Sequence, residues 1–278
     1  MKRREFLTTT LAASTLAGFG TASLTARAAA LERAGRGKRE YYELRIYRLK
    51  NPANRGLLEG YIEKAAIPAL NRLGVKPVGV FVQQERAEAP DSTEVRDANS
   101  VLVLRTYPSL EVFAKATARL SADAEYQRAG AEYLNSPKTN PAFDRIDSWL
   151  MLAFAGLPKL ELPAYCREHK PRMFELRTYE SYSELKALKK VEMFNAGEIG
   201  VMREVGLAPI FYGQVLIGRD LPHLTYMVSG ENQEEHKKHW GAFGAHPTWN
   251  KLKNDPQYAD TVSKITNRFL VPTSYSQI

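Results

Sequence analysis

The sequence predicts an α+β fold made of two ferredoxin-like repeats, each with the element order β-α-β-β-α-β. The first observation is an internal repeat: residues 41–47 read YYELRIY and residues 173–179 read MFELRTY, with Glu, Leu, Arg and Tyr in the same order. The second is that the same offset aligns Gly74 with Gly206, each at the end of a helical pattern. Repetition over this length indicates two copies of one small domain.

The elements of the first copy follow from the spacing of its apolar residues. Alternation predicts a strand over 41–49, and an apolar stripe predicts a helix over 56–73. The remaining predicted elements are strands over 77–84 and 100–107, a helix over 109–129 and a last strand over 143–154. The polar segment RAEAPDSTEVRDANS precedes the third strand and predicts a loop.

The second copy shows the same order. Its predicted elements are a strand over 173–180, a helix over 183–205, strands over 209–218 and 222–229, a helix over 231–252 and a strand over 263–271. Pro68 and Gly200 occupy matching positions in the first helices, and both weaken a helix interior, so we expect a common kink. The second helices are expected to break at SADAEY and at GAHPTW.

These elements divide the chain into a first repeat over 40–155, a linker over 156–171 that contains prolines, and a second repeat over 172–275. A ferredoxin-like sheet has helices on one face only, so its other face must be covered. The second copy can supply that cover. The sequence therefore predicts the intramolecular form of a dimeric α/β barrel, which is compatible with a monomer or a homodimer.

Residues 1–30 predict an export signal. They begin with basic residues, continue with a mildly apolar stretch and end with small residues. The sequence RREFL at residues 3–7 resembles the twin-arginine pattern R-R-x-F-L. We expect a periplasmic or extracellular protein without a stable membrane span after cleavage, and an uncleaved anchor is the alternative.

Composition and charge exclude several classes of function. The formal net charge is +8, and it falls to +5 without residues 1–28, which hold four basic residues and one acidic residue. This excess is spread along the chain, without the basic block interleaved with aromatic residues that is typical of nucleic-acid surfaces. The single cysteine, Cys166, has no intramolecular partner for a disulfide. The sequence has no glycine-rich phosphate loop, G-x-S-x-G elbow or Cys–His pair, so neither phosphoryl transfer nor acyl-enzyme chemistry is predicted.

Three features carry a family resemblance: the openings YELRIY and FELRTY, the joints GVKPVGVF and GLAPIFYGQ, and the aromatic break HPTW. Over nearly all of residues 40–275 the chain resembles the NIPSNAP family. The resemblance implies the dimeric α/β barrel superfamily, which also contains cofactor-free monooxygenases, haem-degrading enzymes and small isomerases. Because NIPSNAP proteins have no agreed biochemical activity, the resemblance implies a fold and not a reaction.

Strand alternation places a Glu, an Arg and a Tyr of each repeat on one face of the sheet. They are Glu43, Arg45, Tyr47, Glu175, Arg177 and Tyr179. Since the helices need an apolar surface, we expect the leucine face to meet the helices and this polar face to line the lumen. In a structural interpretation, each Glu–Arg pair with its Tyr holds the sheets in register. In a functional interpretation, Arg45 or Arg177 binds an acidic or carbonyl-bearing ligand and the Tyr hydroxyl assists.

Four of the five histidines lie in one part of the second repeat, at His223, His236, His239 and His246. After the first-repeat loop, His236 aligns with Phe113 and lies on the inward stripe of its helix. Such a histidine can act as a general base, whereas a solvated charged helix is the simpler alternative. The resemblance adds that haem-binding relatives place their iron ligand in this cleft. His239 shares a helix face with His236, but a third ligand is missing, so no metal site is predicted.

The predicted site lies in the cleft of the second repeat, with His236 as base or haem ligand, Tyr179 as hydrogen-bond partner and Arg177 as anion holder. The other residues predicted to bind the ligand are His239, Trp240, Tyr212, Phe243, Arg45 and Tyr47. The predicted function is binding or oxidation of a small, largely apolar molecule, without a cofactor or with haem. The alternative is a non-catalytic binding or interaction module without a cofactor.

Overall fold

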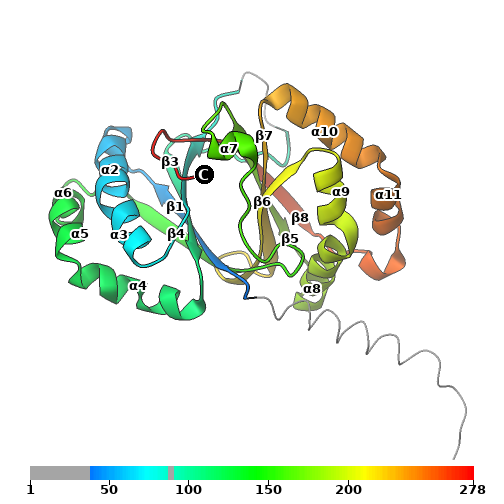
Figure 1. Ribbon diagram of the computed structural model, residues 1–278, viewed down its shortest axis with the longest axis horizontal. Helices are drawn as coiled ribbons and strands as arrows, with labels where there is room; N and C mark the ends of the chain where they lie inside the picture. The colour runs from blue at the N-terminus through cyan, green and yellow to red at the C-terminus, as the bar shows by residue number, and fades with distance from the viewer. Residues whose placement is uncertain (1–37, 87–90) are drawn as a thin grey trace, which may run out of the picture. The chain divides into compact units, whose positions relative to one another are not determined.

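The strands form one closed antiparallel barrel with helices outside it (Figure 1). The computed structural model describes residues 38–86 and 91–278. The export signal predicted over residues 1–30 lies outside the described residues. Among the described helices, none is long and apolar enough to cross a membrane.

Each repeat contributes one antiparallel sheet to the barrel. The strands are β1 Tyr41–Arg48, β2 Val78–Gln83, β3 Ser100–Tyr107, β4 Arg145–Ala153, β5 Met173–Glu180, β6 Ala208–Ile217, β7 His223–Gly230 and β8 Lys264–Pro272. The first repeat has the order β4-β1-β3-β2 and the second the equivalent order β8-β5-β7-β6. Two seams join the sheets, where β2 pairs with β8 and β4 pairs with β6. The predicted α+β fold of two ferredoxin-like repeats in one barrel is confirmed.

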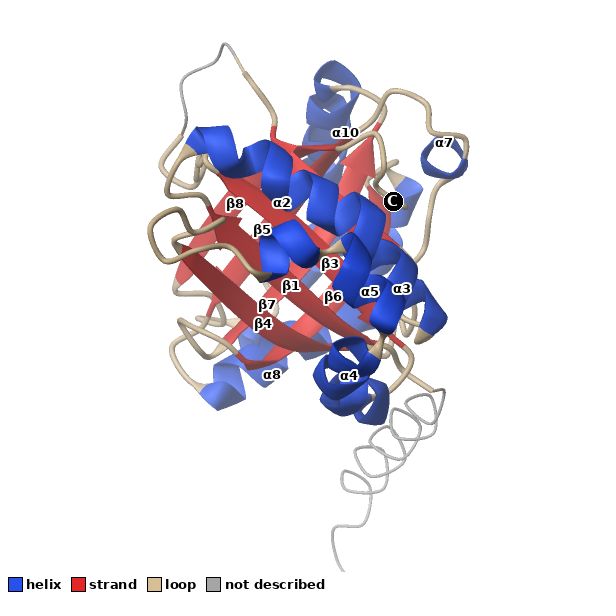
Figure 2. Cartoon of the chain, turned by 90° about the vertical axis from the view of Figure 1, so that its left-hand side faces the viewer, coloured by secondary structure: helices blue, strands red, loops and turns tan. Residues whose placement is uncertain are grey.

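Helices of each repeat lie outside the barrel, and Figure 2 shows α2, α3, α4 and α5 in front of the strands of the first repeat. The helices of the first repeat are η1 Pro52–Asn54, α2 Arg55–Tyr61, η2 Ile62–Ala66, α3 Ile67–Arg72, α4 Leu110–Ala122, α5 Ala124–Ala129 and α6 Ala131–Leu134. Those that follow are α7 Ala164–Arg167, α8 Glu184–Met193, η3 Phe194–Glu198, α9 Ile199–Glu204, α10 Gln233–Ala245, α11 Pro247–Lys253 and η4 Pro256–Tyr258. The two longest helices, α4 and α10, begin after residues whose side chains cap them. The side chain of Ser109 accepts from the backbone N–H of Val112, and the side chain of Asn232 accepts from the backbone N–H of Glu235.

The irregularities shared by the two repeats appear where they were predicted. A π-helical segment, η2 or η3, ends just before Pro68 in the first repeat and just before the matching Gly200 in the second. Pro68 has no N–H to continue the α-helical hydrogen bonding, and the wider turn accommodates it. The second helices break as expected, since α4 ends at Ala122 and α10 at Ala245.

Apolar side chains from both sheets fill the barrel lumen. The cluster includes Tyr42, Leu44, Ile46, Phe81, Leu102, Leu104, Met151, Phe174, Leu176, Phe211, Met227 and Leu270. The prediction that Glu43, Arg45 and Tyr47 line the lumen is therefore wrong, because alternation puts them on the opposite face, toward the helices. The same prediction for Glu175, Arg177 and Tyr179 is wrong for the same reason. A lumen enclosed by hydrogen-bonded strands offers few partners to a charge, whereas the helix layer brings further donors to the sheet.

The segment predicted as a linker packs against one end of this lumen cluster. Leu160, Leu162 and Tyr165 contact the cluster, and Cys166 is buried in it. Burial raises the pKa of the Cys166 thiol to about 11. The thiol is therefore protonated at neutral pH, as expected for a structural cysteine and not for a nucleophile.

Candidate functional site

In the first repeat, the buried carboxylate of Glu43 collects four donors. Its Oε1 accepts from Nε of Arg45 at 2.6 Å and from Oγ of Ser148 at 2.9 Å. Its Oε2 accepts from the hydroxyl of Tyr107 at 2.8 Å and from Nη1 of Arg105 at 3.4 Å. Burial acts to raise the pKa of Glu43, but the two guanidinium groups and the hydrogen bonds lower it below its usual value. Glu43 is therefore ionised at neutral pH.

Beside Glu43, between sheet and helices, lies a cavity of about 300 Å³, which we call the first-repeat cleft. Besides Glu43, Arg45, Arg105 and Tyr107, its lining includes Tyr61, Phe113, Ala116, Thr117, Leu120 and Tyr126. The cavity exists because α4 carries small residues here: Thr117 aligns with Trp240 of the second repeat, and Ala116 with His239.

Arg105 gives the first-repeat cleft its electrostatic character. Its side chain is only 5% exposed, and its Nε has no hydrogen-bond partner among the residues that the structure describes. Two guanidinium groups, of Arg45 and Arg105, face one carboxylate, so the cleft carries an excess positive charge. Burial raises the pKa of Tyr107 to about 12, although Arg105 acts against it, so this hydroxyl stays protonated at neutral pH. The arrangement is suited to holding an anion.

The second repeat builds a similar centre on Glu175, with different donors. Oε1 of Glu175 accepts from Nη1 of Arg177 at 2.6 Å and from Nδ2 of Asn267 at 3.2 Å. Oε2 lies 2.8 Å from Nε2 of His236 and accepts from Nε1 of Trp240 at 2.6 Å. Burial acts to raise the pKa of Glu175, but Arg177 and the bonds from His236 and Arg177 hold it at about 2. Asn267 occupies the position that Ser148 has in the first repeat. His236 and Trp240 of α10 contact the second carboxylate oxygen, as Arg105 does in the first repeat.

His236 and Trp240 occupy the space that is open in the first repeat. Asn232 caps α10 and places His236 one turn later, facing β5, as the inward stripe predicted. Trp240 packs edge-on to Phe243, and the guanidinium carbon of Arg177 lies 4.7 Å from the centroid of a Trp240 ring. The side chains of α10 thus close over Glu175.

The structure divides the predicted site residues among three places. His236, Trp240 and Arg177 each contact the carboxylate of Glu175. Tyr179 joins this group through Arg177, because its hydroxyl accepts from Nε of Arg177 at 3.2 Å. Phe243 packs beside Trp240, and the buried Tyr212 lies deeper, stacked on Tyr226 and donating to Sδ of Met202. The ring of His239 lies against Gly206, and Arg45 and Tyr47 belong to the first repeat. Ligand contacts of these residues stay predictions.

Sequence reasoning missed Arg105, Arg268, Ser148 and Asn267. Arg105 ends the apolar run of SVLVLRTY, and Arg268 comes directly before the apolar FLV of KITNRFLVP; arginine is seldom buried without a role. That signal was available. Ser148 and Asn267 could not be found this way, because only the pairing of β1 with β4 and of β5 with β8 brings them to the two glutamates.

The surroundings of His236 do not fit a haem ligand. A carboxylate only accepts hydrogen bonds, so Nε2 of His236 carries the proton that it shares with Glu175 and has no lone pair for iron. Its Nδ1 is buried beside Gly230, where an added Cβ would lie 3.1 Å away. Within the described residues, no three His, Cys, Asp or Glu side chains are arranged to hold a metal ion.

Solved structures that match this chain cover either most of it or less than half of it. A candidate monooxygenase from Lactobacillus acidophilus aligns with a TM-score of 0.52 and 8% identity, covering 84% of this chain and 94% of that chain. Another from Fusobacterium nucleatum has a TM-score of 0.50 and 10% identity, covering 85% and 93%. An uncharacterised NIPSNAP-like domain protein from Burkholderia xenovorans is 23% identical with a TM-score of 0.35, covering 39% of this chain and 90% of that chain. The first two show a shared fold alone.

The family comparison concerns the second repeat. None of the curated proteins compared with the chain matches it. The NIPSNAP family model matches residues 174–277, which run from the second residue of β5 through β8 and include the helices between them. The chain therefore contains a NIPSNAP domain, and this domain forms the second half of the barrel.

Proposed function

We propose that the first-repeat cleft binds a small organic anion, with an anionic oxygen at Arg105 and Arg45 and an apolar body against Phe113 and Leu120. The observation that carries this proposal is that Arg105 lines a cavity of about 300 Å³ while its buried Nε has no partner among the described residues. A buried donor without a partner costs free energy, and an anionic oxygen satisfies it with a charge-assisted hydrogen bond. The volume lies at the lower end of ligand sites.

This proposal moves the ligand from the second repeat, where the histidines had suggested it, to the first. In the second repeat, His236 and Trp240 satisfy Glu175 and fill the space between α10 and β5. In the first repeat, Ala116 and Thr117 leave that space open. A site needs both room and an unsatisfied polar group, and the first-repeat cleft has both.

Of the two predicted roles, binding and oxidation, the geometry supports binding. The pKa of Glu43 is lowered, chiefly by Arg105 and Arg45 acting against burial, and burial raises the pKa of Tyr107 to about 12. Neither group changes its protonation state near neutral pH, so neither is poised for general acid–base catalysis. The cleft is suited to orienting an anion and neutralising its charge.

Titration of the protein with salicylate, followed by the fluorescence of the ligand, tests the proposal. Arg105→Gln is expected to weaken binding at least about tenfold, because it removes a charge-assisted hydrogen bond. Thr117→Trp, which copies the residue of the second repeat, is expected to abolish binding in this cleft by filling the cavity. Arg119→Gln, an exposed arginine of the same helix, serves as the matched control. The proposal is contradicted if Thr117→Trp keeps the salicylate-binding step that Arg105→Gln weakens, or if the unmodified protein shows no saturable binding.

We also propose that the chain is exported by the twin-arginine route, on the strength of RREFL at residues 3–7. Arg3→Lys together with Arg4→Lys is expected to leave the protein in the cytoplasm of a bacterial host, whereas Lys2→Arg is not. Cell fractionation and immunoblotting measure the distribution. Equal periplasmic amounts of both variants would exclude this route.

A further inference from the structure

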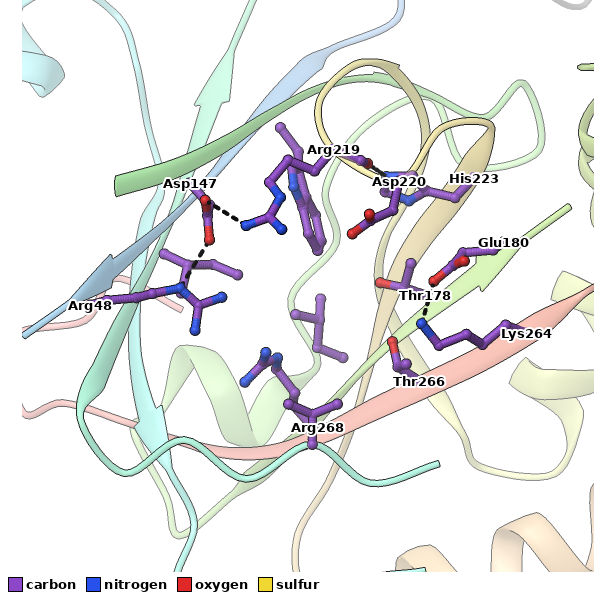
Figure 3. Close-up of a pocket in the computed structure, with 14 residues that line it drawn as sticks. Arg48, Asp147, Thr178, Glu180, Arg219, Asp220, His223, Lys264, Thr266 and Arg268 are labelled. Atoms are coloured by element: carbon purple, nitrogen blue, oxygen red, sulfur yellow. Dashed lines mark hydrogen bonds and ion pairs between the residues drawn. The ribbon is translucent and has the colours of Figure 1, made fainter. Parts of the chain in front are cut away.

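A second cavity, of about 190 Å³, lies at one end of the barrel lumen; we call it the mouth cavity (Figure 3). It follows from the strand register, because lumen-facing positions change from apolar to charged toward the ends of β1 and β5. Ile46 and Leu176 form its floor. Its polar side is lined by Arg48, two residues after Ile46 on β1, and by Glu180, four residues after Leu176 on β5. The first-repeat cleft lies outside the barrel wall, so the two cavities are separate.

Most charged groups around the mouth cavity are paired, as Figure 3 shows. Asp147 accepts from Nε of Arg48 at 3.0 Å, and Nη1 of Arg219 lies 3.4 Å from its other oxygen. Nζ of Lys264 lies 3.0 Å from Oε1 of Glu180. These pairs account for two carboxylates and three cations.

Two further titratable groups line the mouth cavity. Asp220 is exposed at its outer side. Burial lowers the pKa of His223 despite its hydrogen bond to the carbonyl of Arg219, so the imidazole is neutral at neutral pH. Neither group forms an ion pair with the remaining cation, Arg268. Asp97, which pairs with Arg48 at 3.0 Å, and Asp147 act on Arg268 electrostatically but form no ion pair with it.

Arg268 differs from the other cations because its guanidinium forms no ion pair or hydrogen bond with any residue that the structure describes. Its Nη1 is buried. Arg268 pairs in register with Leu176, whose side chain faces the lumen, so the guanidinium enters the cavity above that floor. Nε1 of Trp149, a second donor without a partner among the described residues, belongs to the same lining.

We propose that the mouth cavity binds the carboxylate of a small organic acid, with Arg268 as its bidentate partner and the apolar body against Ile46, Leu176 and Trp149. A guanidinium without a partner matches one carboxylate in geometry and in charge. A phosphate dianion matches less well, because Asp147, Glu180 and Asp220 face the same space. The volume of about 190 Å³ suits an acid of the size of benzoate.

Fluorine NMR of 4-fluorobenzoate added to the full chain tests this site, because each bound population gives its own resonance. The unmodified protein is expected to show a bound signal whose dissociation constant rises at least about tenfold in Arg268→Gln. Arg145→Gln, an exposed arginine on β4 that lines neither cavity, is the matched control and should bind normally. The neutral isostere 4-fluorobenzamide should give no comparable signal.

Folding and location are checked separately. Since Arg268 has no partner among the described residues to strand, Arg268→Gln should melt at the same or a higher temperature, and a large fall would assign Arg268 a structural role and overturn the proposal. The bound signal should survive in Thr117→Trp; loss there, with retention in Arg268→Gln, would assign the acid to the first-repeat cleft alone. A missing signal in the unmodified protein, or displacement by inorganic phosphate more readily than by acetate, would also overturn it.

Discussion

Glu175→Gln is expected to lower the free energy of unfolding by about 3–5 kcal/mol at neutral pH, because it leaves buried donors around a group that can no longer accept from all of them. Glu175 is 1% exposed and receives contacts from Arg177, Asn267, His236 and Trp240. Urea unfolding followed by circular dichroism measures the change. The control is Glu161→Gln, which breaks an exposed pair with Arg203 and should cost less than about 1 kcal/mol.

The pH dependence of this loss is a second readout of the same substitution. The folded-state pKa of Glu175 is about 2 against an ordinary value of 4.5, so the folded protein binds fewer protons between these values. Its contribution, of the order of 3 kcal/mol, is fully present above pH 4.5 and is lost as the pH falls toward 2. The difference between the unmodified protein and Glu175→Gln should therefore shrink in acid. A constant difference across this range would show that the carboxylate charge is not the cause.

Lys190→Leu is expected to lower the free energy of unfolding by about 3 kcal/mol, because it leaves the carboxylate of Glu198 buried without its ion-pair partner. Nζ of Lys190 lies 2.8 Å from Oε2 of Glu198, with side-chain exposures of 4% and 1%. Burial already raises the pKa of Glu198 in spite of Lys190. In Lys190→Leu the cost should diminish at lower pH, where Glu198 takes up a proton.

The double substitution Lys190→Leu with Glu198→Met should recover most of this loss, since an apolar pair replaces a buried ion pair at little cost. The first repeat supports this expectation, because the matching positions hold Leu58 and Ala66, both buried. Lys189→Leu, which breaks the more exposed pair with Glu192, is the control and should cost less than about 1 kcal/mol. A double variant as unstable as Lys190→Leu alone would exclude an uncompensated charge as the reason.

The fold could be predicted because its evidence is local. The repeated ELR motif, the alternation within strands and the kink-forming Pro68 and Gly200 are all read from short segments, and the uncovered sheet face led to the barrel. Which face of β1 lines the lumen could not be read locally. Glu43 and Leu44 lie on opposite faces and are both buried, so the pattern shows which face is polar but not which face the helices cover.

The candidate sites depended on contacts between distant segments. The stripe of α10 correctly placed His236 inward, but its partner Glu175 lies 61 residues earlier and was assigned a structural role in the strand. Arg105 and Arg268 could be noticed as arginines beside apolar runs of their strands. Nε of Arg105 and Nη1 of Arg268 have no partner among the described residues. This absence depends on how several strands and helices pack together. Such unsatisfied donors are visible only once the barrel has closed.

The two seams that join β2 to β8 and β4 to β6 are formed within one chain. In a barrel assembled from two identical chains, every substitution appears in both halves, so a bulky residue that fills one cleft fills the other as well. Here Trp240 closes one cleft while Thr117 leaves the other open, and neither choice constrains its counterpart. Because the two halves are parts of one chain, their sequences can change independently. One half can become more rigid while the other acquires a ligand site.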